Sequence, residues 1–297
     1  MNTWRDGNTR NPVKIRDLWA NFQLDKLTTD DKYPILEQVI IAALDLHDHE
    51  LLRQCLSQLE TKFPASTRVK RLKTMARLEL RERYDEALKV YDDMIKGDEA
   101  NSILYKRKVA ILIAQRKTSE AVKELTEYLK KFMNDQEAWM ELSDLYIQEQ
   151  EYSKAVFCLE ELILLNPDST LYHTRLGEIY YTINTPESLD LARSYFAQAV
   201  KLNPNNLRGL YGLFLSATHP SSTPKTAAQK KKENQKLASW SLTRIKSLYE
   251  EAGSEGPFEE EDSRGDDSSI LGKEILESLE SLVSYLSLGS SKDSGKE

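Results

Sequence analysis

The chain has 297 residues, of which 40% are hydrophobic, 30% charged and 8% aromatic, with only 11 Gly and 9 Pro. This composition is typical of a globular, helix-rich protein, and a chain of this length can bury a sizeable core without metal or disulfide staples. The longest uninterrupted apolar run, Val39 to Leu44, is far shorter than the roughly 20 apolar residues that cross a bilayer. We therefore expect no membrane span.

Charge and cysteine usage point to a protein of the cytosol. The formal net charge is −7, but residues 250–297 hold 14 acidic and 4 basic side chains, so the rest of the chain is close to neutral. Cys55 and Cys158 are too few and too far apart for a disulfide framework or a zinc knuckle, which fits a reducing compartment. The first thirty residues contain no apolar stretch of the kind found in secretory signals.

A small residue in a similar apolar frame recurs at a constant interval. Ala87, Ala121 and Ala155 are spaced 34 residues apart. The register continues forward to Ala192 after 37 residues and backward to Leu52 after 35. Such a period indicates a repeat architecture in which each unit is a helical hairpin and neighbouring hairpins share one core.

The fourth and fifth units match the tetratricopeptide pattern, W-x2-L-G-x2-Y followed by A and P. The matching positions are Trp139, Leu142, Tyr146, Ala155, Leu162 and Pro167, and then Leu176, Gly177, Tyr180, Ala192, Phe196, Ala199 and Pro204. The two preceding units lack the Trp and the Gly, and carry Arg71 and Met75, or Tyr105 and Val109, at those places. We predict an all-α fold, an α-α superhelix (tetratricopeptide repeat solenoid) of about five to six helical hairpins with capping helices.

The two ends depart from the repeat. We predict an N-terminal segment with a capping helix over residues 1–32, the repeat solenoid over 33–252, an acidic disordered linker over 253–269, and a short amphipathic C-terminal helix and tail over 270–297. The linker is predicted because its apolar residues are few and its like charges dense. The capping helix, within 12–27, is predicted from the apolar stripe of Ile15, Leu18, Trp19 and Phe22.

The residues do not form any recognisable catalytic or metal-binding constellation. His47, Asp48 and His49 are close in sequence, but they fall in a predicted turn and no further ligand follows at metal-binding spacing. No glycine-rich phosphate loop, nucleophile elbow or H-E-x-x-H motif is present. We predict that the chain is not an enzyme, with no catalytic residues, no metal and no cofactor.

Basic residues gather in three clusters, at 68–73, 105–108 and 230–232. Nucleic-acid-binding domains are strongly basic, whereas this chain has a pI near 5.4, so we predict no nucleic-acid partner. The clusters are either solvated helix faces or docking points for acidic partner segments or anionic headgroups.

The repeat geometry predicts which side chains face the concave side of the solenoid. If unit positions 4, 7, 8 and 11 contact the partner helix, positions 5, 9 and 12 face the concavity. Together with the basic clusters, this gives a candidate partner-binding groove: Arg71, Lys73, Lys106, Arg107, Ile113, Met140, Asp144, Ile147, Glu178 and Tyr181. The alternative is that several of these side chains pack between adjacent hairpins, since periodicity does not separate two neighbouring buried faces.

Four stretches, 68–95, 135–167, 191–217 and 236–240, resemble the subunit 2 family of the endoplasmic reticulum membrane protein complex, and the resemblance extends from about residue 33 to 252. It implies a tetratricopeptide scaffold without catalytic residues, held peripherally at the cytoplasmic face of the endoplasmic reticulum membrane. The implied partners are the membrane subunits 3 and 5 and a soluble subunit of the 8/9 type. The complex inserts tail-anchored and multi-spanning membrane proteins.

Two other functions remain open. A soluble tetratricopeptide co-chaperone would bind the acidic C-terminal tails of chaperones, but such clamps pair a terminal carboxylate with Lys and Asn, and only Lys106 is present on the predicted inner stripe. An enzyme, or its regulatory subunit, has no residues here to carry the chemistry.

Overall fold

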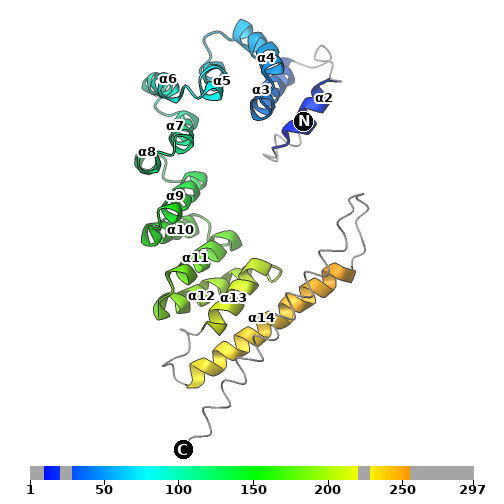
Figure 1. The fold of residues 1–297 in the computed structure, drawn as a ribbon, viewed down its shortest axis with the longest axis vertical. Helices are drawn as coiled ribbons and strands as arrows, with labels where there is room; N and C mark the ends of the chain where they lie inside the picture. The colour runs from blue at the N-terminus through cyan, green and yellow to red at the C-terminus, as the bar shows by residue number, and fades with distance from the viewer. Residues whose placement is uncertain (1–9, 21–28, 220–227, 255–297) are drawn as a thin grey trace, which may run out of the picture. The chain divides into compact units, whose positions relative to one another are not determined.

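The computed structural model describes residues 10–20, 29–219 and 228–254 (Figure 1). All regular secondary structure in these ranges is helical, which confirms the predicted all-α fold. The chain divides into two compact units, residues 1–133 and residues 134–297, which we describe one at a time.

The described part of the first unit contains the helix α2 and three hairpins, α3 with α4, α5 with α6, and α7 with α8 (Figure 1). Its elements are α2 (Pro12–Ala20), α3 (Thr29–Asp45), α4 (His49–Lys62), α5 (Thr67–Arg77), the 3-10 helix η2 (Glu79–Arg81), α6 (Tyr84–Gly97), α7 (Ser102–Ala114) and α8 (Thr118–Lys131).

The second unit contains three further hairpins, α9 with α10, α11 with α12, and α13 with α14. Their bounds are α9 (Gln136–Gln148), α10 (Tyr152–Leu165), α11 (Thr170–Ile183), α12 (Pro186–Leu202), α13 (Leu207–Thr218) and α14 (Ala228–Ser254). The described ranges therefore hold six hairpins, at the upper end of the predicted number, and the last of them continues the array beyond the fifth unit.

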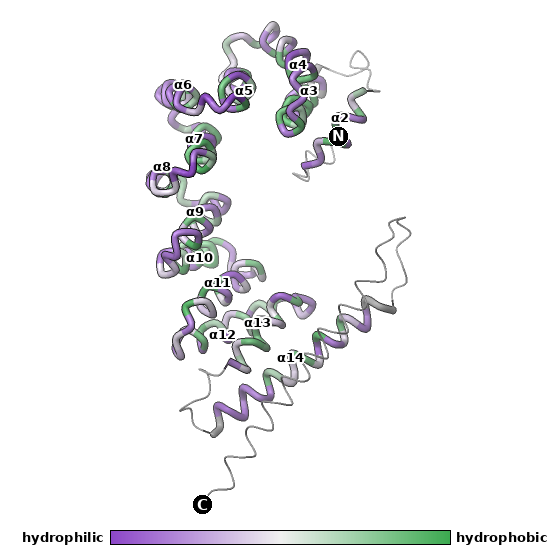
Figure 2. Tube along the Cα trace, viewed as in Figure 1, coloured by the Kyte–Doolittle hydropathy of each residue, from purple (hydrophilic) through white to green (hydrophobic). Residues whose placement is uncertain are grey.

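The residues that recur at the repeat interval are buried in the structure. Ala87, Ala121, Ala155 and Ala192 are completely buried, and Leu52 is nearly so. Each helix carries one apolar and one polar face, visible as alternating green and purple segments in Figure 2. The repeat therefore arises from burial of one apolar stripe per helix, as tetratricopeptide hairpins require.

The turn inside each hairpin repeats with the same period. A non-glycine residue has a left-handed backbone, with φ between 57° and 60°, at His47, Glu82, Arg116, Gln150 and Asn184. After the first four of these, the next residue donates its N–H to a carbonyl five residues back, as in Lys117 N to Leu112 O at 2.9 Å. This bond closes the end of the first helix with a Schellman motif. The fifth hairpin, with its three extra residues, instead starts α12 with a capping box at Thr185.

The N-terminal helix packs as predicted on one side only. Ile15 is buried and Trp19 packs partly buried against the cluster formed by α3, α4 and α5. Leu18, predicted to belong to the same stripe, is 46% exposed. That part of the prediction is wrong, because the face of α2 that packs on the cluster includes Ile15 and Trp19 but not Leu18. Phe22 lies outside the described residues.

The predicted segment boundaries stay predictions. The linker over 253–269 and the helix over 270–297 lie almost entirely outside the described residues, and only the end of α14, at Ser254, reaches into the first of them.

Candidate partner-binding groove

A groove of about 680 Å³ opens in the first unit, between the N-terminal helix α2 and the first helices of the three hairpins, α3, α5 and α7. Its apolar lining comes mainly from Ile15, Ile41, Leu72, Met75, Ile103 and Ala110. Its charged lining consists of Arg10, Arg68, Arg71, Lys106 and Arg107, together with the carboxylates Glu37 and Asp45. Three predicted groove residues, Arg71, Lys106 and Arg107, are thus brought together here.

Two arginines in the wall of the groove, Arg68 and Arg71, pair with the same carboxylate, that of Glu37. Glu37, on α3, is 8% exposed and accepts from Arg71 Nη2 at 2.9 Å. Arg68 pairs with the other oxygen of the same carboxylate. A buried carboxylate needs such partners, since an unpaired charge would have to lose its hydration without compensation. Glu37 therefore joins α3 to α5 and orients two arginines of the groove.

Arg107 takes part in a second buried cluster. It pairs with Glu79, whose side chain lies in η2, and the Tyr91 hydroxyl donates to the same carboxylate at 2.5 Å. Burial alone would lower the pKa of Arg107, but the hydrogen bond and charge of Glu79 outweigh it and raise the pKa. Burial, assisted by the Glu79 charge, also raises the pKa of Tyr91. Arg107 therefore stays charged and Tyr91 stays neutral at neutral pH. Arg107 joins α7 to η2 as well as lining the groove.

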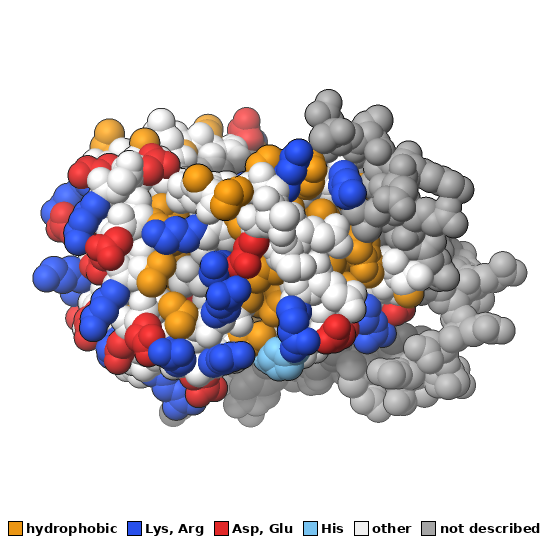
Figure 3. Space-filling view, turned by 90° about the horizontal axis from the view of Figure 1, so that it is seen from above, with side chains coloured by type: hydrophobic (Ala, Val, Ile, Leu, Met, Phe, Trp, Pro, Cys, Tyr) orange, Lys and Arg blue, Asp and Glu red, His pale blue; other side chains and the backbone are white. Residues whose placement is uncertain are grey.

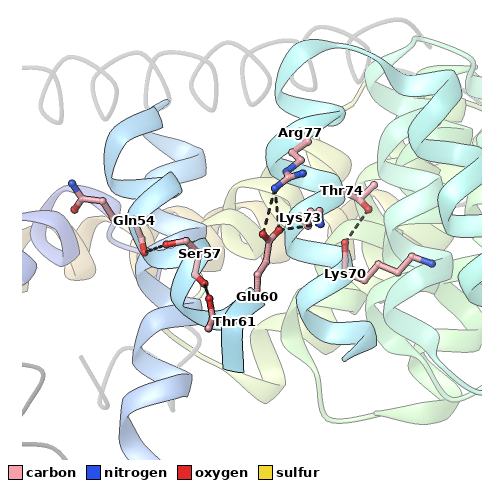
Figure 4. A network of polar contacts seen from close by, with 8 residues as sticks. All are labelled: Gln54, Ser57, Glu60, Thr61, Lys70, Lys73, Thr74 and Arg77. Atoms are coloured by element: carbon pink, nitrogen blue, oxygen red, sulfur yellow. Dashed lines mark hydrogen bonds and ion pairs between the residues drawn. The ribbon is translucent and has the colours of Figure 1, made fainter. Parts of the chain in front are cut away.

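Lys73 and Ile113, also predicted for the groove, do not line it. The Lys73 ammonium lies 3.3 Å from Glu60 on α4, and Arg77 reaches the same carboxylate at 3.3 Å. Figure 4 shows Glu60 between these two cations. Lys73 therefore faces the other helix of the preceding hairpin, one of the two orientations that the periodicity had left open. Ile113 is half-buried on α7.

The predicted groove residues of the second unit make contacts between its own hairpins. Met140 and Ile147 pack partly buried against the cluster around Ala155. Asp144 pairs with Arg175 of the next hairpin.

The remaining two candidates of the second unit lie on α11. Glu178 accepts from Arg208 Nη2 at 2.8 Å. Tyr181 meets His219 edge to face, with ring centroids 5.6 Å apart. These contacts match the inter-hairpin packing that sequence reasoning offered as the alternative.

Sequence reasoning missed the contribution of α2 to the groove. Arg10, which precedes α2, lines it and donates from Nε to Asp45 at 2.7 Å, so the start of the N-terminal helix and the residues just before it supply a wall. The sequence signal was weak, because this wall is formed mainly by residues just before α2 and at its start, and not by a periodic stripe. Arg68, by contrast, lay within a recognised basic cluster, and its position in the repeat could have assigned it.

The surface of the chain mixes both signs of charge with apolar atoms. In Figure 3, Lys and Arg side chains alternate with Asp and Glu, and hydrophobic atoms lie between them. Within the described ranges, no three His, Cys, Asp or Glu side chains are arranged to hold a metal ion. The helices described are each too short or too polar to cross a membrane.

The structure places the histidine cluster in a turn and both cysteines in the interior. His47 and His49 are exposed at the turn between α3 and α4, where Asp48 caps α4 by accepting from Leu51 N at 3.1 Å. Cys55 and Cys158 are both free and buried. Burial raises the pKa of the Cys55 thiol to about 11 and that of the Cys158 thiol to about 12, so both stay protonated and unreactive at neutral pH.

Comparison with known proteins assigns the chain. Residues 58–194 match the family model described as the EMC2 TPR-like repeat domain. The chain is 48% identical to ER membrane protein complex subunit 2-A of Xenopus laevis over 256 residues, which is 85% of this chain and 86% of that protein. It is 31% identical to ER membrane protein complex subunit 2 of Dictyostelium discoideum, covering 74% of this chain and 71% of that protein. The chain belongs to the ER membrane protein complex subunit 2 family.

Membership of the ER membrane protein complex subunit 2 family confirms the predicted resemblance, and this family of repeat subunits is not known as enzymatic, in agreement with the predicted lack of enzyme activity. The TPR repeat protein oca3 of Schizosaccharomyces pombe is 30% identical over 62% of this chain and 66% of that protein. Among solved structures, pilF of Pseudomonas aeruginosa is 17% identical, with a TM-score of 0.48, over 76% of this chain and 99% of that one.

Proposed function

We propose that the chain is a non-catalytic scaffold subunit at the cytosolic face of the endoplasmic reticulum membrane. It holds cytosolic parts of the other subunits of the complex, and so supports insertion of tail-anchored and multi-spanning membrane proteins. The proposed partners are the membrane subunits 3 and 5 and a soluble subunit of the 8/9 type, and membrane association is peripheral, through these partners. Family membership supports this proposal.

The observation that carries the proposal is the groove of the first unit. Its apolar lining offers surface to bury, and its arginines and Lys106 offer donors to carboxylates and backbone carbonyls. Grooves of this mixed character bind extended or helical segments of other proteins. At about 680 Å³, the groove holds a short stretch of side chains, not a whole domain. We infer that it receives one cytosolic segment of a partner subunit.

A test by mutation must avoid the groove residues that hold the fold. Reversing Arg107 would leave the buried Glu79 carboxylate without its cation, so an assembly defect in that variant would not separate binding from folding. Lys106→Glu and Ile103→Asp are better choices. Lys106 is half-buried at the groove, and Ile103 lines it while remaining 52% exposed.

The measurement is recovery of membrane subunits with the tagged chain in mild detergent. We expect Lys106→Glu and Ile103→Asp each to lower recovery several-fold, with unchanged helical circular dichroism. Lys89→Glu is the matched control, because it makes the same charge change at an exposed site on α6. Wild-type recovery for both groove variants would refute the groove as the partner site. Recovery of no membrane subunit by the wild-type chain would refute the scaffold itself.

A further inference from the structure

Two arginines in the lining of the groove, Arg68 and Arg71, share a single carboxylate. Both pair with Glu37, and within the described ranges neither has a second acidic partner. The other two arginines of the lining each have a carboxylate of their own, Asp45 for Arg10 and Glu79 for Arg107. One positive charge therefore remains without a matching carboxylate at Arg68 and Arg71, on the side of the groove formed by α3 and α5.

One hydrogen-bond donor of the same arginine pair lacks an acceptor. Arg71 donates from Nη2 to Glu37 at 2.9 Å, but its buried Nε has no partner among the residues that the structure describes. The Arg71 side chain lines the groove and is only 15% exposed, so little water reaches it. Such a donor is unfavourable, because it has lost its water without a replacement. A carboxylate on the groove side of Arg71 would supply both the missing acceptor and the missing negative charge.

An apolar patch, formed by Ile41 and Met75, lies one helical turn beyond the arginine pair. Ile41 follows Glu37 by four residues on α3, and both side chains line the groove. Met75 follows Arg71 by four residues on α5, and like Ile41 it is half-buried in the lining. Because α3 and α5 are the first helices of successive hairpins, they run in the same direction. Four helical residues rise about 6 Å, so a cationic site and an apolar patch lie about that far apart along the groove.

We propose that the partner segment in this groove carries an acidic side chain that contacts Arg68 and Arg71, next to a large apolar side chain that covers the apolar patch. A separation of about 6 Å corresponds to positions i and i+4 of a helix, or i and i+2 of an extended segment. A basic side chain at the same place is rejected, since it would bring a third cation to one carboxylate. This inference rests on the proposed function, because it names the chemistry of the segment that the groove receives.

The first step of the test identifies the segment. The full-length chain carrying Ile103→p-benzoylphenylalanine is produced in cells together with the other subunits and irradiated, and the crosslinked partner peptide is read by mass spectrometry. Ile103 suits the probe because it lines the groove and is 52% exposed, so a larger side chain does not disturb the core. We expect a partner peptide with Asp or Glu two or four positions from a large apolar residue. A peptide without an acidic residue would overturn the proposal.

The second step removes one cation of the pair. Arg68→Gln should lower both the crosslink yield and the recovery of membrane subunits several-fold, with unchanged helical circular dichroism. The fold should tolerate this change, since the Arg68 side chain is 68% exposed and Glu37 keeps Arg71 as its partner. Lys70→Gln is the matched control, because it removes the same charge from an exposed site on α5 that does not line the groove. Wild-type yield and recovery for Arg68→Gln would count decisively against the acidic contact.

The third step exchanges the charges across the interface. Arg68→Glu should abolish most of the crosslinking to the wild-type partner. Replacing the acidic residue of the crosslinked peptide by Arg should restore the yield at least in part in that background, because the two charges attract again. The same partner variant should lose crosslinking to the wild-type chain. If each single change lowers the yield and the pair restores none of it, the two charges do not meet and the proposal is wrong.

The two proposals fail separately. If a partner peptide crosslinks in the groove but lacks an acidic residue, or is insensitive to changes at Arg68, only the recognition of a carboxylate is refuted. If no partner peptide crosslinks, and Lys106→Glu and Ile103→Asp also leave the recovery of membrane subunits at the wild-type level, the assignment of the groove to a partner subunit is refuted, and the acidic contact with it.

Discussion

In the first unit, ion pairs on buried carboxylates join the hairpins that line the groove, whereas in the second unit the ion pairs between hairpins are more exposed and an aromatic ring packs on glycine. Glu37 and Glu79 each pair with an arginine of the next hairpin. In the second unit, the buried ring of Phe196 lies against Gly177 and Gly212. One architecture is therefore held together by two kinds of contact.

This difference between the two units parallels how closely each one matches the tetratricopeptide pattern. Where the pattern places Trp, the second hairpin has Arg71, and where it places Gly, Met75. A buried ion pair is on balance a weak stabiliser, because desolvation offsets much of its Coulombic gain. In the first unit, these ion pairs hold arginines in place at the groove: Glu37 pairs with Arg68 and Arg71, and Glu79 pairs with Arg107. Loss of the repeat pattern and presence of a charged groove thus coincide in the same hairpins.

The largest expected effect compares the ion pairs of the two units. Arg107→Ala leaves the Glu79 carboxylate, whose side chain is 8% exposed, with Tyr91 as its remaining partner, and should cost about 3 kcal/mol of unfolding free energy. Arg208→Ala removes the pair with Glu178 in the second unit, but the Arg208 side chain is 68% exposed, so the cost should be about 1 kcal/mol or less.

Urea unfolding followed by circular dichroism measures both losses. Adding Glu79→Gln to Arg107→Ala should restore part of the stability, because the neutral amide carries no charge to be left unpaired while it can still accept from Tyr91. Equal losses for Arg107→Ala and Arg208→Ala would mean that burial does not distinguish the two units.

The next effect concerns glycine, and its sign differs between the units. A Cβ at Gly212 would collide with the ring of Phe196, which is buried and not free to move away. Gly212→Ala should therefore cost about 1–3 kcal/mol. Gly97, at the end of α6 in the first unit, has open space around it, so Gly97→Ala should stabilise by about 0.5–1 kcal/mol.

The clash itself can be checked by making room for the new methyl group. In the background of Phe196→Leu, Gly212→Ala should lose most of its cost, since the ring atoms that it meets are gone. A thermal or urea midpoint that moved equally for Gly212→Ala in both backgrounds would contradict this packing.

The sequence predicted the helices and their repeat well, because the 34-residue interval and the buried Ala87, Ala121 and Ala155 are local features of composition and spacing. It did not predict the ion pairs. Along the chain, α6 separates Glu79 from Arg107, and no periodicity links a carboxylate in a 3-10 turn to a cation 28 residues later.

The lining of the groove was likewise predicted only in part, because some of it depends on contacts between residues distant in sequence. Lys106 follows from the helical register, and Arg71 and Arg107 from the basic clusters, whereas the wall formed by Arg10 depends on how the start of α2 packs against α3. Lys73 carried the same sequence signal as its neighbours, and only the position of Glu60 on α4 decides that it faces the other way. Register predicts which side chains share a face, but not which neighbour that face meets.

The smallest effect compares two turn residues that share the same φ. Arg116 in the first unit and Asn184 in the second are both exposed and left-handed, with φ of 58°. Side chains with a Cβ pay roughly 1–2 kcal/mol for this conformation, except that Asn tolerates it, and glycine adds a cost of roughly 0.5–1 kcal/mol through its freer unfolded chain. Arg116→Gly should therefore stabilise by up to about 1 kcal/mol, while Asn184→Gly should be neutral or slightly destabilising.

The urea concentration at the unfolding midpoint, compared with that of the wild-type chain at an unchanged m-value, measures the change in stability of each variant. A gain only at Arg116 would mean that its turn retains backbone strain and is held left-handed by the Schellman bond from Lys117 N to Leu112 O. No gain at Arg116 would mean that the strain is already relieved elsewhere in the turn. The recurrence of this conformation without a single glycine would then reflect tolerance of the turn and not a cost carried by every hairpin.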